Sequence, residues 1–464
     1  MRDKDQVACL VCCLVLSLPL RAQQAHAPAA PVPRAEPLTD IGQLGPGPVG
    51  SIDLSGEASI DWSDLSEKSK APAGPRAARF TLGHEASVRA AGERDIISNR
   101  SSLRLEYSRF FLDSFFVQFD SKLNGFWNND HRARAHDRRA EVHTQEAFLQ
   151  YGASGGATSL KAGVQRLIWG ESEGGAITDV VSPRNFREAF VIPLEEARVG
   201  QFMLNVDHFS TLGDWSFFYI PRPKFNKYPA KGTAYFIEPF DSNAEIRDEP
   251  PGKRHEYGMR WKKTFGKSDI SFMAASLLDN DYVYRADGIA GMDGMVISRT
   301  AQRFTMAGMT FNYAAGQFLV KGEVALKSPK AFNDARFQLV ENDMVDSSLG
   351  VTYSMGQSNT VGVELVNSHV RNWSEQIVGP RRNTSSVVLN TNLFFLSETL
   401  SVNWLLIYNR PFTSYQSSIR TSYKWTDNLT FGVDIHAIDA PDRNSPLRPY
   451  RDMDQVAFKL HYAF

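Results

Sequence analysis

Apolar and polar residues alternate singly through long stretches of this chain. In the final stretch, residues 456–464, the even positions are apolar or aromatic, whereas Lys459 and His461 stand at odd positions. Successive side chains of a β-strand point to opposite faces, so a period of two indicates strands with one apolar and one polar face. The sequence therefore predicts an all-β protein.

The lengths of these stretches and of their connections distinguish two architectures, a soluble β-sandwich or solenoid and a transmembrane barrel. A strand that crosses a bilayer needs about 9–11 residues, whereas soluble strands usually have about 5–6. Short turns, such as residues 266–267, alternate here with long polar loops, such as 169–197, 221–254, 279–301 and 328–345. Short periplasmic turns opposite long external loops are typical of outer-membrane barrels. We therefore expect a transmembrane antiparallel β-barrel.

Eighteen alternating stretches lie between residues 79 and 464, so about 18 strands (16–18) are expected. An even number also returns both chain ends to the periplasm. A barrel of this size is wide enough for an aqueous channel. Residues 51–62 alternate as cleanly as any of these strands and are interpreted as an extra strand outside the main count.

The N-terminus has the pattern of a secretory signal peptide. Arg2 and Lys4 precede an apolar run over residues 7–20, and a small residue, Ala22, follows. The run is shorter than the ~20 residues of a membrane-spanning helix. All three cysteines, Cys9, Cys12 and Cys13, lie in it, so the exported chain is expected to fold without disulfides. The predicted divisions are a signal peptide (1–22), an Ala/Pro-rich linker (23–50), an extra strand with its connection (51–78) and the barrel (79–464).

The last strand resembles the assembly signal of bacterial outer-membrane proteins, through Phe458, Leu460, Tyr462 and Phe464. This resemblance implies a Gram-negative outer-membrane location, with membrane lipid, lipopolysaccharide and the barrel-assembly machinery as partners. With 51 Lys+Arg against 52 Asp+Glu, the chain has no bulk basic field, and we expect no nucleic-acid partner.

The polar faces of the strands carry charges of both signs, which favours passage of hydrated solutes with a weak ionic preference. The alternative is that these residues only satisfy one another. The predicted lumen-lining residues are Arg104, Glu106, Asp120, Lys122, Lys321, Glu323, Arg420 and Lys424.

The loop 169–197 is dense in opposed charges and contains the Gly174-Gly175 pair and Pro183. We expect it to fold into the lumen and form the narrowest part of the pore, as charged rings do in channels. An external loop with ion pairs worth about 0–1 kcal/mol each is the alternative. The predicted constriction residues are Glu171, Glu173, Asp179, Arg184, Arg187 and Glu188.

The runs Trp169–Ser172 and Asp179–Asn185 resemble a motif of a large, mostly uncharacterised family of proteobacterial porin-like outer-membrane proteins. Asn99-Arg100 and the following Leu103–Tyr107 also resemble that family's opening strands. Ser182 and Asn185 stand where Asn and Asp are expected, so no role tied to those side chains is implied. More distantly, the architecture is similar to that of alginate-export barrels. The resemblance implies a barrel and transport without naming a substrate.

Two functions fit these features: an outer-membrane channel for small polar or amphipathic solutes, and an export portal for a polymer or lipid. The linker and segment 51–62 favour a periplasmic partner for the portal. The sequence contains no Gly-x-Ser-x-Gly, His-Glu-x-x-His or phosphate-loop motif, so we expect no enzyme, cofactor or metal. The basic run 131–139 is expected in an external loop, solvated or bound to lipopolysaccharide phosphates. The loop 221–254, rich in Pro and aromatic residues, is expected to cap the mouth.

Overall fold

The computed structural model describes residues 78–90, 95–111, 114–136, 139–152, 156–188, 191–192, 197–237, 244–290 and 294–464. The predicted signal peptide, linker and segment 51–62 lie outside these residues, and their assignment stays a prediction.

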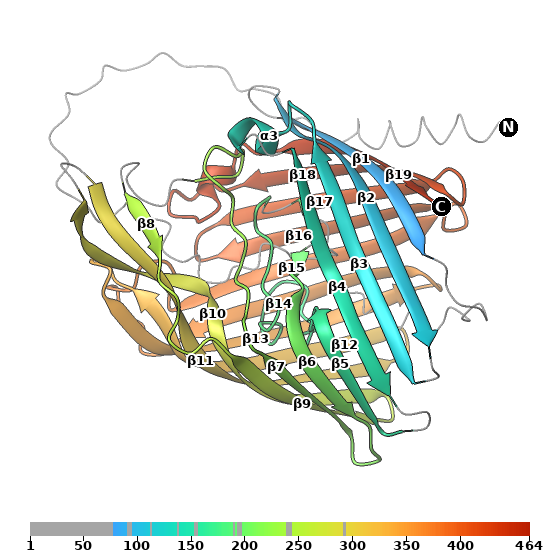
Figure 1. The fold of residues 1–464 in the computed structure, drawn as a ribbon, viewed down its shortest axis with the longest axis horizontal. Helices are drawn as coiled ribbons and strands as arrows, with labels where there is room; N and C mark the ends of the chain where they lie inside the picture. Colours follow the sequence, from blue (N-terminus) through green and yellow to red (C-terminus); the bar gives the residue numbers. More distant parts are fainter. Residues whose placement is uncertain are drawn as a thin grey trace. The chain divides into compact units, whose positions relative to one another are not determined.

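Eighteen of the nineteen strands in the described part of the chain form one closed antiparallel ring (Figure 1). The exception is β8, which pairs in parallel with β11 while β7 pairs directly with β9. The predicted barrel of about 18 strands is confirmed. The elements are β1 (Arg79–Arg89), β2 (Ile96–Phe111), β3 (Phe115–Phe126), α3 (His131–His136), β4 (Ala140–Gly152), β5 (Thr158–Gln165), β6 (Gln201–His208), β7 (Asp214–Ile220), β8 (Glu245–Asp248), β9 (Glu256–Phe265), β10 (Ser268–Ala290), β11 (Gly294–Ala315), β12 (Phe318–Asn333), β13 (Leu339–Met355), β14 (Asn359–Val370), β15 (Asn383–Phe395), β16 (Leu400–Arg410), β17 (Ser414–Lys424), β18 (Leu429–Asp439), η2 (Arg448–Tyr450) and β19 (Gln455–Ala463).

The ring closes between its first and last strands. β1 pairs with β19 from Thr81 opposite Ala463 to Arg89 opposite Gln455. Beyond this ladder, Phe80 and Phe464 exchange backbone hydrogen bonds of 3.0 and 2.9 Å. No edge strand is left in the ring, which is the condition for placing a sheet in lipid.

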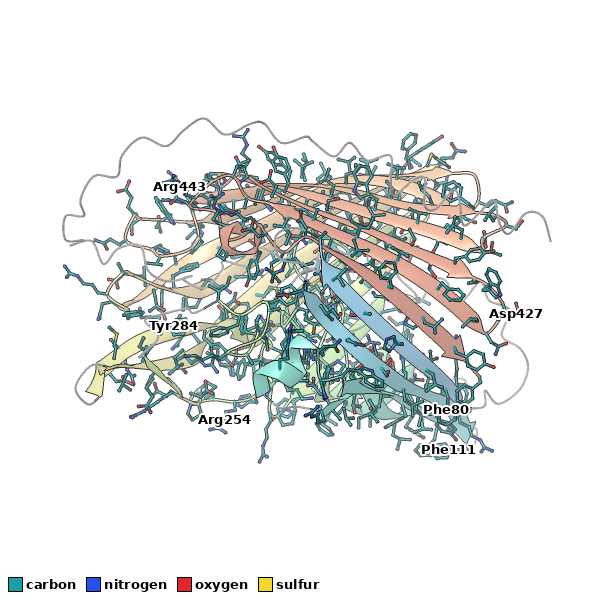
Figure 2. The ribbon with its side chains drawn as sticks, turned by 90° about the horizontal axis from the view of Figure 1, so that it is seen from above. Phe80, Phe111, Arg254, Tyr284, Asp427 and Arg443 are labelled. Atoms are coloured by element: carbon teal, nitrogen blue, oxygen red, sulfur yellow. The ribbon has the colours of Figure 1, made fainter. Side chains whose placement is uncertain are left out.

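The outer face of the ring is apolar, as the alternation predicts. Leu349, Leu365 and Phe458 are more than half exposed on it. Aromatic rings of neighbouring strands pair at the end with the shorter connections, for example Phe111 with Phe115 and Phe80 with Phe464. Figure 2 shows Phe80 and Phe111 at this end, opposite the end that carries the long connections. Such an aromatic girdle is typical of a membrane interface.

The strands β10 to β13 are longer than predicted. The expected polar loops 279–301 and 328–345 consist largely of strand, and β10 and β11 pair up to Ala290 opposite Gly294. A hairpin that extends beyond the apolar band of the outer wall needs no apolar outer face. Its sequence therefore lacks the alternation that predicts a strand, and a loop was predicted instead. The expectation of irregular structure there is wrong.

The stacked pair at the closure gives a test of the predicted assembly signal. The rings of Phe80 and Phe464 lie 5.6 Å apart. We expect Phe464→Ala to lower the unfolding free energy of the lipid-embedded barrel by about 1 kcal/mol through loss of this pair. Urea titration with a gel-shift readout measures the change. Phe395→Ala, at the same end but without a ring partner among the described contacts, is the control, and an equal loss in both would contradict the assignment.

Candidate functional site

The segment 166–200, between β5 and β6, leaves the wall and contacts the far side of the ring. We call it the inner segment. It makes hydrogen bonds to residues of β12, β14 and β15, and β15 stands opposite β5 in the ring order. The contacted carboxylates of Glu323 and Glu364 are buried, whereas their neighbours Val324 and Leu365 are exposed on the outer face. The segment therefore contacts the inner face of the opposite wall.

The tip of the segment, residues 171–175, is held by two wall carboxylates. Glu171 and Ser172 donate their backbone N–H groups to Glu323. The Ser172 hydroxyl and the Glu173 N–H donate to Glu364, at 2.5 and 2.8 Å. Irregular backbone inside a barrel needs partners for its polar groups, and these two carboxylates supply them.

The carboxylates of the tip are also paired with the wall. Glu173 forms an ion pair with Lys321 and accepts a hydrogen bond from Asn390. Burial raises the pKa of Glu171, and a hydrogen bond from Asn312 opposes this rise. Lys321 and Glu323, predicted to line the lumen, are therefore covered by the tip.

The Gly174-Gly175 pair allows the tip to approach the wall closely. A Cβ atom on Gly174 would lie 2.3 Å from Val388, and one on Gly175 would lie 3.0 Å from Val366. Val366 and Val388 are buried on the inner faces of β14 and β15. Any larger side chain at residue 174 would push the tip away from the wall.

Along β6–β12 the barrel interior contains an apolar core. Trp169, Ile177 and Val181 of the segment pack against inward side chains of β6, β7 and β10–β12, and Trp169 meets Phe218 edge-on at 5.2 Å. The interior therefore differs from the charged lining that the alternation predicts all round the barrel. The buried inward residues are Met203, Phe218, Ile220, Met273, Ala275, Leu277, Phe304, Met306 and Ala325.

Asp179 and Arg184, two predicted constriction residues, pair with each other inside the segment. Asp179 accepts hydrogen bonds from Arg184 at 3.1 Å and from Arg198 at 2.8 Å, and all three side chains are largely buried. This arrangement fixes the turn of the segment. The side chains of Asp179 and Arg184 therefore point at each other and do not form part of a pore lining.

Arg187 and Glu188 lie in a charged cluster with β2, α3 and β4. Glu188 pairs with Arg100 at 2.9 Å and with Arg132 at 2.6 Å, and Arg187 pairs with Glu141 at 2.7 Å. Burial opposes ionisation of Glu188, but Arg100 and Arg132 outweigh it and hold its pKa well below the ordinary value.

The basic run 131–139 is not simply a solvated external loop. His131 and Arg132, in α3, are buried, and both contact Glu188. Both side chains lie inside the barrel mouth, so the expectation of solvation or lipopolysaccharide contact is wrong for these two residues.

A second segment, 221–237, runs beside the first. Lys227 donates its N–H to the carbonyl of Arg184 at 2.8 Å, and Phe186 donates to the carbonyl of Lys227 at 2.7 Å. Tyr235 is buried with Ile97 of β2 and Met453. Burial, reinforced by Arg187, lowers the pKa of Lys227 to about 8. Residues 221–237 of the predicted cap are thus joined to the inner segment, whereas β8, in the rest of the cap, pairs with β11.

The remaining predicted lining residues lie on the polar side of the interior. Arg104 donates two hydrogen bonds of 2.8 Å to Asp120 and lies 3.5 Å from Glu106. Lys122 lines a cavity between β1–β3 and the segment. Arg420 shares Asp434 with Lys459. Lys424 is exposed at the end of β17 with the shorter connections.

Sequence reasoning missed two kinds of residue. Arg100 and Glu364 were seen as strand residues, and nothing local shows that they meet a segment about 90 or 190 positions away in the chain. The inward apolar side chains do have a signal, because β7 and β10 carry apolar residues on both faces. A strand that loses its alternation in this way indicates an interior that is filled.

The comparisons with known proteins agree with this architecture. Residues 109–464 match the family described as "Protein of unknown function (DUF1302)". The chain belongs to this family. The match begins in β2, so it includes the inner segment and every later strand of this DUF1302 member. No curated protein matches the chain.

Solved structures share the fold of this DUF1302 barrel, among them two from Acinetobacter baumannii. OccAB4 and OccAB1 of Acinetobacter baumannii are 10% and 9% identical to it, with TM-scores of 0.51 and 0.50. The matches cover 83% of this chain and 97% and 96% of those chains. The matched structures are outer-membrane porins, so the porin-like part of the predicted resemblance is confirmed at the level of the fold.

The described residues include no helix long and apolar enough to cross a membrane. No group of three or more His, Cys, Asp or Glu side chains among them could hold a metal ion.

The docking of the tip can be tested by a disulfide. The three native cysteines lie in residues 9–13, and serine replacements there leave a clean background. In that background we expect Gly175→Cys with Val366→Cys to form a disulfide, because the two positions are in contact and a bridge needs a Cβ separation of about 3.5–4.5 Å. Protection from alkylation, read by mass spectrometry, measures it. Gly175→Cys with Leu365→Cys is the matched control pair. Leu365 directly precedes Val366 and lies on the outer face, so this pair should not cross-link.

Proposed function

We propose that the protein is an outer-membrane channel that passes small polar or amphipathic solutes, narrowed by the inward segment 169–197. The observation that carries this proposal is the closed ring with a segment anchored across its interior by Glu323 and Glu364. The apolar core formed with β6–β12 leaves the polar faces of β1–β3 and β16–β19 as the route for a hydrated solute.

Three further features support this function. The apolar outer wall with its aromatic girdle fits a location in the bacterial outer membrane. The mixed charges on the route fit a polar solute. Arg187 and Glu188, on the face of the segment toward β2 and α3, stand where they would narrow the route. We propose no enzymatic activity for this barrel.

The alternative is an export portal for a polymer or lipid, related to alginate-export barrels and served by a periplasmic partner. One observation favours it: the inner segment and segment 221–237 are hydrogen-bonded to each other and to the wall. An interior held at so many points suits a portal that stays shut until a partner opens it. Outer-membrane lipid, lipopolysaccharide and the barrel-assembly machinery remain proposed partners in both cases.

Single-channel conductance in a planar bilayer tests the proposal. We expect steady conductance from the purified, refolded protein and a higher conductance from the double variant Glu323→Gln/Glu364→Gln. Neutral amides are weaker acceptors than carboxylates, by roughly a factor of two in hydrogen-bond strength, so the tip should leave the wall more often. Deletion of residues 170–188 should raise conductance further.

Glu341→Gln is the matched control, because Glu341 is an exposed carboxylate on the neighbouring strand β13. Its conductance should equal that of the wild type. A silent wild type that opens on release of the tip would replace the channel by the portal. Silence in all variants, from a folded barrel, would overturn both functions.

A further inference from the structure

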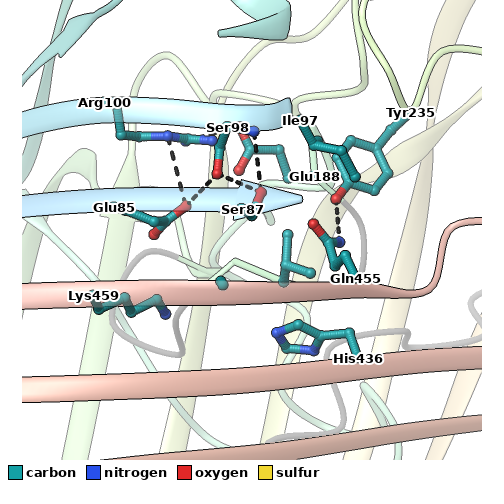
Figure 3. A pocket seen from close by; sticks show the side chains of 12 residues that line it. Glu85, Ser87, Ile97, Ser98, Arg100, Glu188, Tyr235, His436, Gln455 and Lys459 are labelled. Atoms are coloured by element: carbon teal, nitrogen blue, oxygen red, sulfur yellow. Dashed lines mark hydrogen bonds and ion pairs between the residues drawn. The ribbon is translucent and has the colours of Figure 1, made fainter. Parts of the chain in front are cut away.

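Two adjoining cavities lie on the polar side of the interior, between the first strands, the last strands and the inner segment. One is shown in Figure 3, and the other lies beside it. They share the lining residues Glu85, Arg100, Glu188 and Val191. We treat them as one site, the β1–β3 cavity.

Cations outnumber carboxylates among the side chains that line the β1–β3 cavity. The cations are Arg100, Lys122, Arg132, Arg187 and Lys459, and the carboxylates are Glu85 and Glu188. Glu188 is shared by two of these cations, at 2.9 and 2.6 Å. Glu85 accepts a hydrogen bond from Ser98 and lies 3.7 Å from Arg100. Both carboxylates are thus already engaged.

Three more carboxylates pair with these cations but lie on the side away from the cavity. Asp130, Glu141 and Asp434 pair with Arg100, Arg187 and Lys459 respectively, but none of the three lines either cavity. The side chain of Asp434 is 4% exposed, against 14% for Lys459 and 24% for Arg420, which shares it. A charge inside the cavity is therefore closer to the cations than to their counter-ions, and Coulomb attraction falls with distance.

The cavity also has an apolar side. Ile97, Tyr235 and Ala457 line the smaller cavity, and Ile192 lines the larger one. Figure 3 shows Ile97 and Tyr235 together at one end and Arg100, Glu85 and Lys459 at the other. An inorganic ion would use only the charged end. A molecule with an anionic group and a compact apolar body would use both ends.

We propose that the β1–β3 cavity binds an amphipathic organic anion, with a carboxylate or phosphate group toward Lys122 and Lys459 and an apolar body toward Ile97 and Tyr235. Guanidinium and ammonium groups recognise both kinds of oxyanion. The assignment rests on the proposed function, because the site lies on the proposed route through the barrel. It replaces the weak ionic preference expected from the sequence by a preference for anions.

The test combines ion selectivity with binding. In a KCl gradient, the reversal potential of the wild type should report anion selectivity, and added benzoate should interrupt the single-channel current. Lys122→Gln/Lys459→Gln should weaken benzoate block about tenfold, the effect of losing charge-assisted contacts, and shift the reversal potential toward zero. Lys161→Gln is the matched control, since Lys161 is an inward lysine of β5, paired with Asp207, that lines neither cavity.

Calorimetric titration of benzoate into the refolded protein reads the site without conduction. A silent protein that binds benzoate, with loss in the Lys122/Lys459 variant alone, would overturn the channel and support the site. A conducting protein that is cation-selective and indifferent to benzoate and to inorganic phosphate would overturn the site and leave the channel. Block by phosphate but not by benzoate would overturn the apolar part of the assignment, and phenyl phosphate against benzoate then separates the two oxyanions.

Discussion

The backbone hydrogen bonds between β1 and β19 are the constraint on which the rest of the structure depends. In lipid, no water is present to satisfy an open strand edge, so an unpaired first or last strand would cost several kcal/mol for each exposed group. Closing the ring removes this cost. It also separates an apolar outside from an inside where polar groups can be placed, and everything that distinguishes this barrel is built in that inside.

The inner segment shows how irregular backbone is accommodated there. Its N–H groups donate hydrogen bonds to the carboxylates of Glu323 and Glu364. Its charged side chains form ion pairs with the wall or within the segment itself. Replacing one member of a buried ion pair usually destabilises a protein more than the pair stabilised it, because the other charge stays buried alone. The pairs of the segment therefore specify one position for it, while Trp169 and its apolar neighbours supply the packing.

The strands of the wall could be predicted from the sequence, but the contacts of the interior could be predicted only in part. Each of the eighteen ring strands corresponds to a predicted stretch, because a period of two is a local signal. The inward course of the segment could be expected from its density of charge. Its partners could not be predicted, since Glu364 and Ser172 meet only when the ring closes. Asp179 and Arg184, predicted as constriction residues, pair with each other only in the folded segment. The added length of β10 to β13 was missed because a strand that extends beyond the membrane band needs no apolar outer face.

The bridge between Asn185 and Lys227 has a consequence for how this barrel changes over evolutionary time. Loops on the outside of a barrel normally accept insertions and deletions independently. These two connections share backbone hydrogen bonds, and Phe186 stacks on Tyr228 across the join. A residue gained or lost near the bridge in one of them shifts its register against the other. A change of length in one connection is therefore expected to be accompanied by a matching change in the other.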